Sequence, residues 1–395
     1  MQIADAVVIG GGIIGTSIAF RLARQGRSVV LIEKGILASG TSGACDKAIF
    51  LQSKKVGLHL ELAKASAALY QSLEEELDTS LEYERTGGMI VIETEEQLEI
   101  MKGFVEKQQH SGIRVDLLSQ AETHAMQPTL SPHVVGATWS GEDADVNPLL
   151  VTHGFASAAK RAGAVIMTHT EVMGIMKEKN RVTGVMTSRG AIATELIINA
   201  AGPYAPTIGR LAGVEIPIIP RRGMILITER MPPMLKGNML CAQYITAKHM
   251  AGAEPAKQQE DRCGIGLSFG QTKSGNFLLG GSREFTGFDR HVPPETLRKI
   301  ASHACRIIPF LCNTRIIRTM VGFRPFTGDG LPIIGEAPEL KGFIIAAGHE
   351  GDGIALSPIT GMIVANIAEK RGPYLALAES LGLERFQDRP LTRSL

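Results

Sequence analysis

Residues 6–33 constrain the fold more than any other part of the chain. They begin with an apolar run, Ala6-Val7-Val8-Ile9, and continue through Gly10-Gly11-Gly12-Ile13-Ile14-Gly15 into a stretch with helical character, 16–25. A second apolar run, Ser28-Val29-Val30-Leu31-Ile32, ends at Glu33. A buried strand, a glycine turn, a helix and a second strand that ends in an acid form the dinucleotide-binding fingerprint. The sequence therefore predicts a Rossmann-like α/β domain here.

The spaced glycines and the acid of this fingerprint have separate roles. Gly10 permits a tight turn, Gly12 lets the backbone approach a pyrophosphate, and Gly15 lets the helix pack closely against the strand. The pyrophosphate would lie at the helix N-terminus, where N–H groups and the helix dipole favour anions. Glu33 is placed to accept ribose hydroxyl groups and disfavours a 2′-phosphate, so we do not expect NADP. The fingerprint alone leaves FAD and NAD open.

Length, charge and cysteine usage narrow the class of protein. A chain of 395 residues is too long for one compact core, so we expect two domains. The net charge of +1 gives no reason to expect a nucleic acid as partner. The five cysteines include no CxxC pair, which argues against a disulfide framework and against a zinc or iron–sulfur site, so we expect no metal. We expect a reducing, cytoplasmic location, with membrane attachment only through a partner.

The order of the expected elements indicates a chain that leaves the first domain twice. We expect segments 1–86, 144–216 and 320–395 to form the nucleotide-binding domain, and segments 87–143 and 217–319 to form a discontinuous α+β domain on a mixed sheet. Residues 58–77 are predicted to form one long amphipathic helix. The polar stretch 251–262 is predicted to be a mobile loop that covers a site. The predicted fold class is α/β.

Several segments rich in small residues are placed to face a ligand. The loop 38–47 offers N–H groups and hydroxyls to a phosphate or a flat ring. Ala200 and Gly202 follow a predicted strand, where small residues fit a closely approaching nucleotide. A further predicted strand, 342–347, runs into a glycine-rich turn and a helix over 358–369, which again makes a site for negative charge.

Three separated motifs make the chain resemble a known family over nearly its whole length: the D-amino-acid oxidase/glycine oxidase (DAO) family of FAD-dependent oxidoreductases. They are the fingerprint, the segment GFRPFTGDGLPIIG and the segment AAGHEGDGIALSP. Within the family the chain looks most similar to the FAD-bearing β subunits of heteromeric dehydrogenases. These include opine (octopine and nopaline) oxidases, hydrogen cyanide synthase, and D-hydroxyproline and proline dehydrogenases. The stretch CDKAIFLQSKK points to that branch.

The resemblance implies FAD as the cofactor and names the residues that bind it. The chain has no cysteine or histidine where sarcosine oxidases attach flavin, so we expect the FAD to be non-covalent. Asp46 and Lys47 stand where glycine oxidase has small or apolar residues. The positions that match FAD contacts are Gly10, Gly12, Ile13, Ile14, Gly15, Glu33, Lys34, Gly40, Thr41, Ser42, Cys45, Asp46, Lys47, Val172, Ala200, Gly202, Gly348, His349, Glu350, Gly351, Asp352, Gly353 and Ile354.

The resemblance also implies oxidation of a carbon–nitrogen bond by hydride transfer to the flavin. Arg324 matches the arginine that binds the substrate carboxylate, and a guanidinium fits a carboxylate bidentately. A structural salt bridge is the alternative role of Arg324. His349 is a candidate base, although the family mainly uses backbone at this position. Gly351 and Tyr244 are candidates for the substrate pocket, although the sequence favours an ordinary strand residue for Tyr244.

The expected partners follow from the same branch of the family. We expect an amino acid, imino acid or opine as substrate, an α subunit as partner, and a small iron–sulfur γ subunit as a further partner. One alternative is a stand-alone glycine, sarcosine or D-amino-acid oxidase that produces hydrogen peroxide. Another is a non-catalytic FAD-binding scaffold. A third is an NAD-dependent dehydrogenase, which the C-terminal motifs disfavour.

Overall fold

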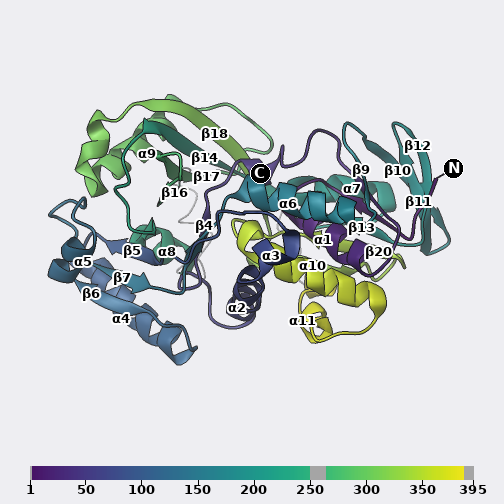
Figure 1. The fold of residues 1–395 in the computed structure, drawn as a ribbon, viewed down its shortest axis with the longest axis horizontal. Coiled ribbons are helices and arrows are strands. Elements are labelled where there is room, and N and C mark those ends of the chain that lie inside the picture. Colours follow the sequence, from purple (N-terminus) through teal and green to yellow (C-terminus); the bar gives the residue numbers. More distant parts are fainter. Residues whose placement is uncertain (1, 250–263, 387–395) are drawn as a thin grey trace.

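Two large β-sheets stand towards opposite ends of the elongated molecule (Figure 1). The computed structural model describes residues 2–249 and 264–386. One sheet has six strands in the order β19-β20-β13-β2-β3-β9. Their bounds are β19 (Ile333–Glu336), β20 (Phe343–Ala347), β13 (Ile197–Asn199), β2 (Ala6–Ile9), β3 (Val29–Ile32) and β9 (Val165–Met167). All neighbouring pairs are parallel except β19 with β20.

Both faces of this six-stranded sheet are covered, which explains why its strands are mostly apolar. Side chains alternate along a strand, so Ala6 and Val8 enter one core and Val7 and Ile9 enter another. The first core contains residues of α1, α6 and α10 together with residues of other helices, and the second contains residues of α7 and a four-stranded sheet. These elements are α1 (Ile13–Arg24), α6 (Pro148–Arg161), α10 (Gly353–Glu369), α7 (Ala205–Ala212), β1 (Gln2–Ile3), β10 (Val172–Glu178), β11 (Arg181–Thr187) and β12 (Gly190–Ala193).

The second large sheet has eight strands in the order β18-β14-β17-β16-β15-β5-β7-β6. It is mixed, because β15 and β5 are parallel and the other pairs are antiparallel. One face packs against α9, with Met224 and Leu226 of β14 in the shared core. The elements are β5 (Gly88–Ile92), β6 (Asp116–Ser119), β7 (Gly136–Ser140), β14 (Ile219–Arg230), β15 (Asn238–Cys241), β16 (Gly264–Gln271), β17 (Asn276–Arg283), β18 (Ile316–Phe326), α4 (Glu95–His110), α5 (Gln120–Met126), α8 (Ala242–His249) and α9 (Pro294–Ile307).

The remaining helices, strands and turns are short. The predicted helix over 58–77 is two helices, α2 (Leu58–Tyr70) and α3 (Leu73–Leu77), so the prediction of one continuous helix is wrong. The Tyr70 hydroxyl donates to the backbone oxygen of Ile354, which ties the end of α2 to α10. The remaining elements are β4 (Ala48–Ile49), β8 (Ala144–Asp145), α11 (Leu375–Glu379) and 3-10 turns at Thr41–Gly43, Gly202–Tyr204, Pro309–Asn313 and Leu383–Phe386.

The predicted α/β fold with a mixed second sheet is confirmed. The two large sheets take their strands from alternating stretches of the chain, and the predicted boundary at 319/320 falls inside β18 of the eight-stranded sheet. The division into domains otherwise stays a prediction. The predicted loop 251–262 lies outside the described residues. Within residues 2–249 and 264–386, no helix is both long enough and apolar enough to cross a membrane.

Candidate active site

The glycine turn between β2 and α1 leaves the N-terminus of α1 accessible to an anion. Gly10 has φ +116°, and a Cβ there would lie 2.5 Å from the backbone oxygen of Ala200. Gly12 is the N-cap of α1 and provides no side-chain cap. A Cβ on Gly12 would meet only the Ser42 hydroxyl, at 3.1 Å, and that hydroxyl accepts from the Ile13 N–H at 3.0 Å. The helix end is therefore lined by backbone and one hydroxyl, as a pyrophosphate site requires.

The end of β3 gathers the residues predicted to meet the adenosine. The Glu33 carboxylate accepts from the N–H groups of Gly11 and Gly35, each at 2.7 Å. Lys34 forms an ion pair with Glu171 at 2.7 Å, directly before Val172 opens β10. Glu33, Lys34 and Val172 thus share one edge, and their contact with the adenosine stays a prediction.

The loop 38–47 is fastened to the rest of the molecule by its own side chains. The Thr41 hydroxyl donates to the backbone oxygen of Phe323 at 2.5 Å, and the Cys45 thiol donates to the oxygen of Ser42 at 3.1 Å. Burial raises the pKa of the Cys45 thiol, so it stays protonated. The loop therefore borders both sheets without a reactive thiolate. Gly40, in the same loop, and Gly202, after β13, face open space, since a Cβ on either would meet nothing within 4 Å.

Asp46 and Lys47, the two departures from the glycine oxidase pattern, bind different partners. Asp46 accepts from the Ser268 hydroxyl of β16 at 2.8 Å. Lys47 forms an ion pair at 2.6 Å with Asp145, which also accepts from a side chain of β15. The Lys47 charge is therefore neutralised, and both residues link this loop to the eight-stranded sheet.

The turn 348–354 runs from β20 into the N-terminus of α10. Gly348 and Glu350 both have positive φ, +85° and +50°, which bends the backbone sharply. Asp352 is the N-cap of α10 but forms no cap with its side chain, and the first turn of α10 holds no acid. Its carboxylate pairs instead with Lys54 and lies 3.1 Å from the Nε2 of His59. The N–H groups of this helix end thus point to a site that favours negative charge, the property expected around the electron-rich edge of a flavin.

His349 occupies a buried position inside this turn. Its side chain is 3% exposed, and its Nε2 lies 2.9 Å from the Thr360 hydroxyl. Burial lowers the pKa of His349 to about 3, and nearby Asp352 only partly opposes this effect. The imidazole is therefore neutral near pH 7, and its position in the core favours a structural role over that of a base.

The candidate substrate residues lie together beside the turn 348–354. A Cβ on Gly351 would be 3.7 Å from Arg324 Nε and 4.0 Å from the Tyr244 hydroxyl. Arg324 Nη1 also donates to the backbone oxygen of Ser282 at 2.9 Å. Burial and then the charge of Arg283 lower the pKa of Arg324. Tyr244 lies on α8 and not on a strand, so the expectation of an ordinary strand residue is wrong.

Two further arginines complete this group and were missed in the sequence. Arg221 forms an ion pair with Glu350 of the turn. The Arg283 guanidinium lies over the ring of Tyr244, with Cζ 3.9 Å from the ring centroid. The alternation of side chains along a strand could have revealed Arg221. Arg221 lies opposite Arg324 in the pairing of β14 with β18, so both side chains leave the same face of the sheet.

The residues present fit FAD. Two helix N-termini without acidic side chains in their first turns, α1 and α10, both begin after strands of the six-stranded sheet. Glycines that leave open space border them, and an acid ends β3. We infer that the turn after β2, Glu33 and the loop 38–47 would hold the dinucleotide, and that the turn 348–354 would contact the flavin.

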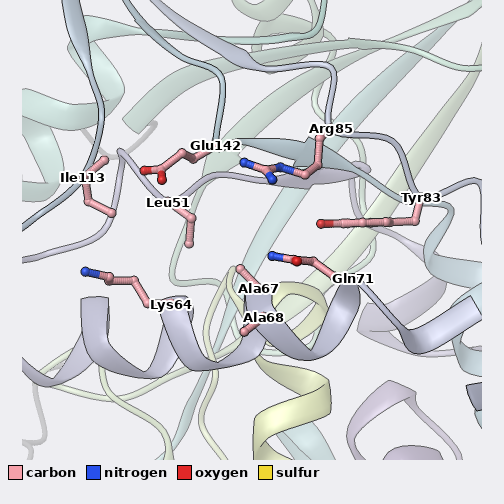
Figure 2. A pocket seen from close by; sticks show the side chains of 9 residues that line it. All are labelled: Leu51, Lys64, Ala67, Ala68, Gln71, Tyr83, Arg85, Ile113 and Glu142. Carbon is pink, nitrogen blue, oxygen red and sulfur yellow. The ribbon is translucent and has the colours of Figure 1, made fainter.

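A surface pocket of about 150 Å³ lies elsewhere (Figure 2). Its floor is α2, and Arg85 and Glu142 stand on the opposite side. None of the candidate site residues lines it; the lining residues are Leu51, Lys64, Ala67, Ala68, Gln71, Tyr83, Arg85, Ile113 and Glu142. We therefore do not place the active site there.

Comparisons with known proteins agree with this arrangement. Residues 5–367 match the DAO family, described as FAD dependent oxidoreductase. The chain is 30% identical to glycine oxidase of Geobacillus kaustophilus over 95% of both chains, and 27% identical to the hydrogen cyanide synthase subunit HcnC of Pseudomonas aeruginosa over 98% of this chain and 97% of HcnC. Among solved structures it is similar to L-proline dehydrogenase from P. horikoshii, with a TM-score of 0.87, 30% identity and 98% of both chains covered. The chain belongs to the DAO family and is an FAD-dependent oxidoreductase.

Proposed function

We propose that the chain oxidises the carbon–nitrogen bond of an amino or imino acid, with non-covalently bound FAD as the electron acceptor. The observation that carries the proposal is the position of Arg324. Its guanidinium lies beside Gly351 in the turn that we assign to the flavin, with the Tyr244 hydroxyl on the same side. A carboxylate held by this fork would place the α-carbon of its own molecule next to that turn. The names of the relatives, glycine oxidase and L-proline dehydrogenase, support an amino-acid substrate.

The chain's own residues would bind and orient the substrate. Arg324 fixes the carboxylate, and the Tyr244 hydroxyl borders the same space beside Gly351. When bound, FAD supplies the two-electron acceptor. The substrate amine must be neutral to release a hydride from the α-carbon, so activity should rise with pH until another group titrates. The resulting carbon–nitrogen double bond then hydrolyses in water. His349 is too buried to reach the substrate.

The finer part of the proposal concerns the electron acceptor and the substrate class. We propose that the chain is the catalytic β subunit of a heteromeric dehydrogenase that acts on an opine, hydroxyproline, proline or glycine type of substrate. The name of HcnC, a synthase subunit, supports a heteromer. The sequence has no CxxC pair for an iron–sulfur cluster, so onward electron transfer would need an α subunit or a small iron–sulfur γ subunit. The cysteine usage supports a cytoplasmic location, with any membrane contact made through those partners.

A stand-alone oxidase is the second candidate function. The similarity to glycine oxidase extends over 95% of both chains. In this case oxygen would accept the electrons and hydrogen peroxide would form. The two candidates share the same site and differ only in the acceptor.

An anaerobic absorbance titration of the purified, FAD-loaded chain tests the proposal. One member of a panel of amino acids, imino acids and opines should bleach the flavin band, and readmitted air then separates oxidase from dehydrogenase. Arg324→Ala should lower kcat/KM roughly 30-fold or more while FAD stays bound, because it leaves a carboxylate unpaired in a buried site. Arg318→Ala, an exposed arginine on the same strand, is the matched control and should change neither. A yellow protein that no compound bleaches, with or without partner subunits, would favour a non-catalytic scaffold.

A further inference from the structure

Strand alternation sorts the arginines of the eight-stranded sheet onto two faces. Arg222 of β14 and Glu284, which directly follows β17, form an isolated bridge and a buried ion pair on the face that packs against α9. Their neighbours Arg221 and Arg283 therefore leave the opposite face, together with Arg324. Three guanidinium groups thus converge where the turn 348–354 meets this sheet.

Only one of these three arginines has a carboxylate partner within the described residues. Arg221 is paired with Glu350. Arg324 donates to a backbone oxygen, and the acid whose charge it feels, Asp46, is already engaged by the Ser268 hydroxyl. The Arg283 side chain has no hydrogen bond or ion pair in the described part of the chain, and its buried Nε has no acceptor.

The contact of Arg283 with Tyr244 leaves the N–H groups of the Arg283 guanidinium accessible to a ligand. The guanidinium stacks on the ring at 3.9 Å, which fixes its plane and leaves the N–H edge unused. Tyr244 extends from this stack towards Gly351, where its hydroxyl and Arg324 Nε lie within 4.0 Å of the same point. Arg283 and Arg324 therefore flank one residue, Tyr244, one over the ring and one near the hydroxyl.

Arg283 and Arg324 are two partly buried cations that repel each other, and neither forms an ion pair within the described residues. Each charge is costly to keep out of water unless an anion pairs with it. A substrate with one carboxylate would compensate one of them, whereas a substrate with two carboxylates would compensate both. Arg283 would therefore determine which of the amino acids allowed by the proposed function is the preferred substrate.

We propose that Arg283 binds a second carboxylate of the substrate, so that the chain acts on an N-(carboxyalkyl) amino acid, a secondary amine with a carboxylate on each arm. Arg324 holds the carboxylate of the arm that is oxidised, and Arg283 holds the carboxylate of the other. The inference rests on the proposed function, because it assigns a substrate class to the same site.

A matched pair of small ligands isolates the role of Arg283. Iminodiacetate and N-methylglycine share the amine and one carboxylate and differ only in the second carboxylate. Dissociation constants come from isothermal titration calorimetry of the chain whose FAD has first been reduced with dithionite, so that neither ligand can be oxidised during the titration. The wild-type chain should bind iminodiacetate more tightly than N-methylglycine. Arg283→Gln should weaken iminodiacetate binding roughly 10- to 100-fold and change N-methylglycine binding less than about threefold.

Two further variants keep the test decisive. Arg283→Lys retains a charge but loses the planar fork, so iminodiacetate binding should weaken by a factor between those of the wild-type chain and Arg283→Gln. If Arg283→Gln loses FAD, Arg283→Lys is used in its place. Arg318→Gln removes an exposed arginine of the same sheet and should alter neither constant. Equal weakening of both ligands by Arg283→Gln, or a wild-type chain without preference for iminodiacetate, overturns the inference. Failure of every amine to reduce the flavin would instead overturn the proposed function, since the ratio of binding constants is measured separately.

Discussion

Replacing His349 tests whether the turn 348–354 depends on a buried neutral imidazole. Burial lowers the pKa of His349 to about 3, from 6.5 in an exposed chain. Between these values the unfolded chain binds a proton that the folded chain excludes. The stability due to the neutral ring is therefore fully present above pH 6.5 and is lost as the pH falls towards 3. At pH 5 the loss is about 2 kcal/mol, because the medium lies about one and a half pKa units below 6.5 and each unit is worth about 1.4 kcal/mol.

His349→Gln should remove that part of the acid sensitivity. Glutamine cannot titrate, and its amide can still donate to the Thr360 hydroxyl that faces the imidazole. Urea unfolding of both proteins at pH 7 and pH 5, at one fixed excess of FAD, gives the four free energies needed. The drop in unfolding free energy from pH 7 to pH 5 should be smaller in the variant by about 2 kcal/mol. Other carboxylates and histidines contribute equally to both proteins and cancel.

An equal drop in the two proteins would refute this account of His349. The affinity for FAD is measured separately at each pH, because a change in cofactor binding would also shift the apparent stability. The same variant should keep the rate of flavin reduction by substrate within a few-fold. A loss of more than about 100-fold in a folded, FAD-loaded variant would be the magnitude of a missing general base and would restore the catalytic role considered for His349.

Two other predictions concern helix packing and cofactor affinity. Gly361→Val should destabilise the protein by about 1–3 kcal/mol, because a Cβ at Gly361 would lie 3.1 Å from the backbone oxygen of Ser17 in α1. The matched control is Gly103→Ala in α4, which should raise the stability by up to about 1 kcal/mol, since a Cβ at that position would meet nothing within 4 Å. Thermal unfolding measures both effects. Glu33→Ala should weaken FAD binding roughly 10- to 100-fold, because it removes the expected ribose contact and the acceptor of the Gly11 N–H. Fluorescence titration of the apoprotein with FAD measures this, and an unchanged dissociation constant would contradict the assignment.

The sequence was most informative where a single residue type meets a strict local requirement. Gly10 shows this, since its φ of +116° and the nearby Ala200 oxygen exclude a side chain. Arg324 and Gly351 could be assigned to the same site because each lies in one of the two C-terminal motifs that carry the family resemblance. The division of 58–77 into two helices could not be predicted, because the tertiary contact of Tyr70 with α10 lies at the break and no proline or glycine marks it.

Residues that act through strand pairing escaped the sequence analysis. Arg283 shares a face with Arg324 only through the register of β14, β17 and β18, which depends on pairings between residues far apart in the chain. Tyr244 was placed on a strand because local propensity favours one there, whereas the chain forms α8 after β15. Arg283 could be recognised only in the assembled sheet, whereas Tyr244 was a pocket candidate from the sequence and only its secondary structure was predicted wrongly.

The alternation of the two sheets along the chain has a consequence for how the protein is made. The centre of the six-stranded sheet joins β2, near the start of the chain, to β13 and then to β20, which begins at Phe343. A ribosome must therefore synthesise most of the polypeptide before β13 receives its second neighbour and the turn 348–354 exists. Until then β13 presents an unpaired apolar edge, the kind of surface that chaperones protect and that aggregates form from. We expect cofactor loading to be a late step of biogenesis, and fragments that end before β20 to accumulate as insoluble protein.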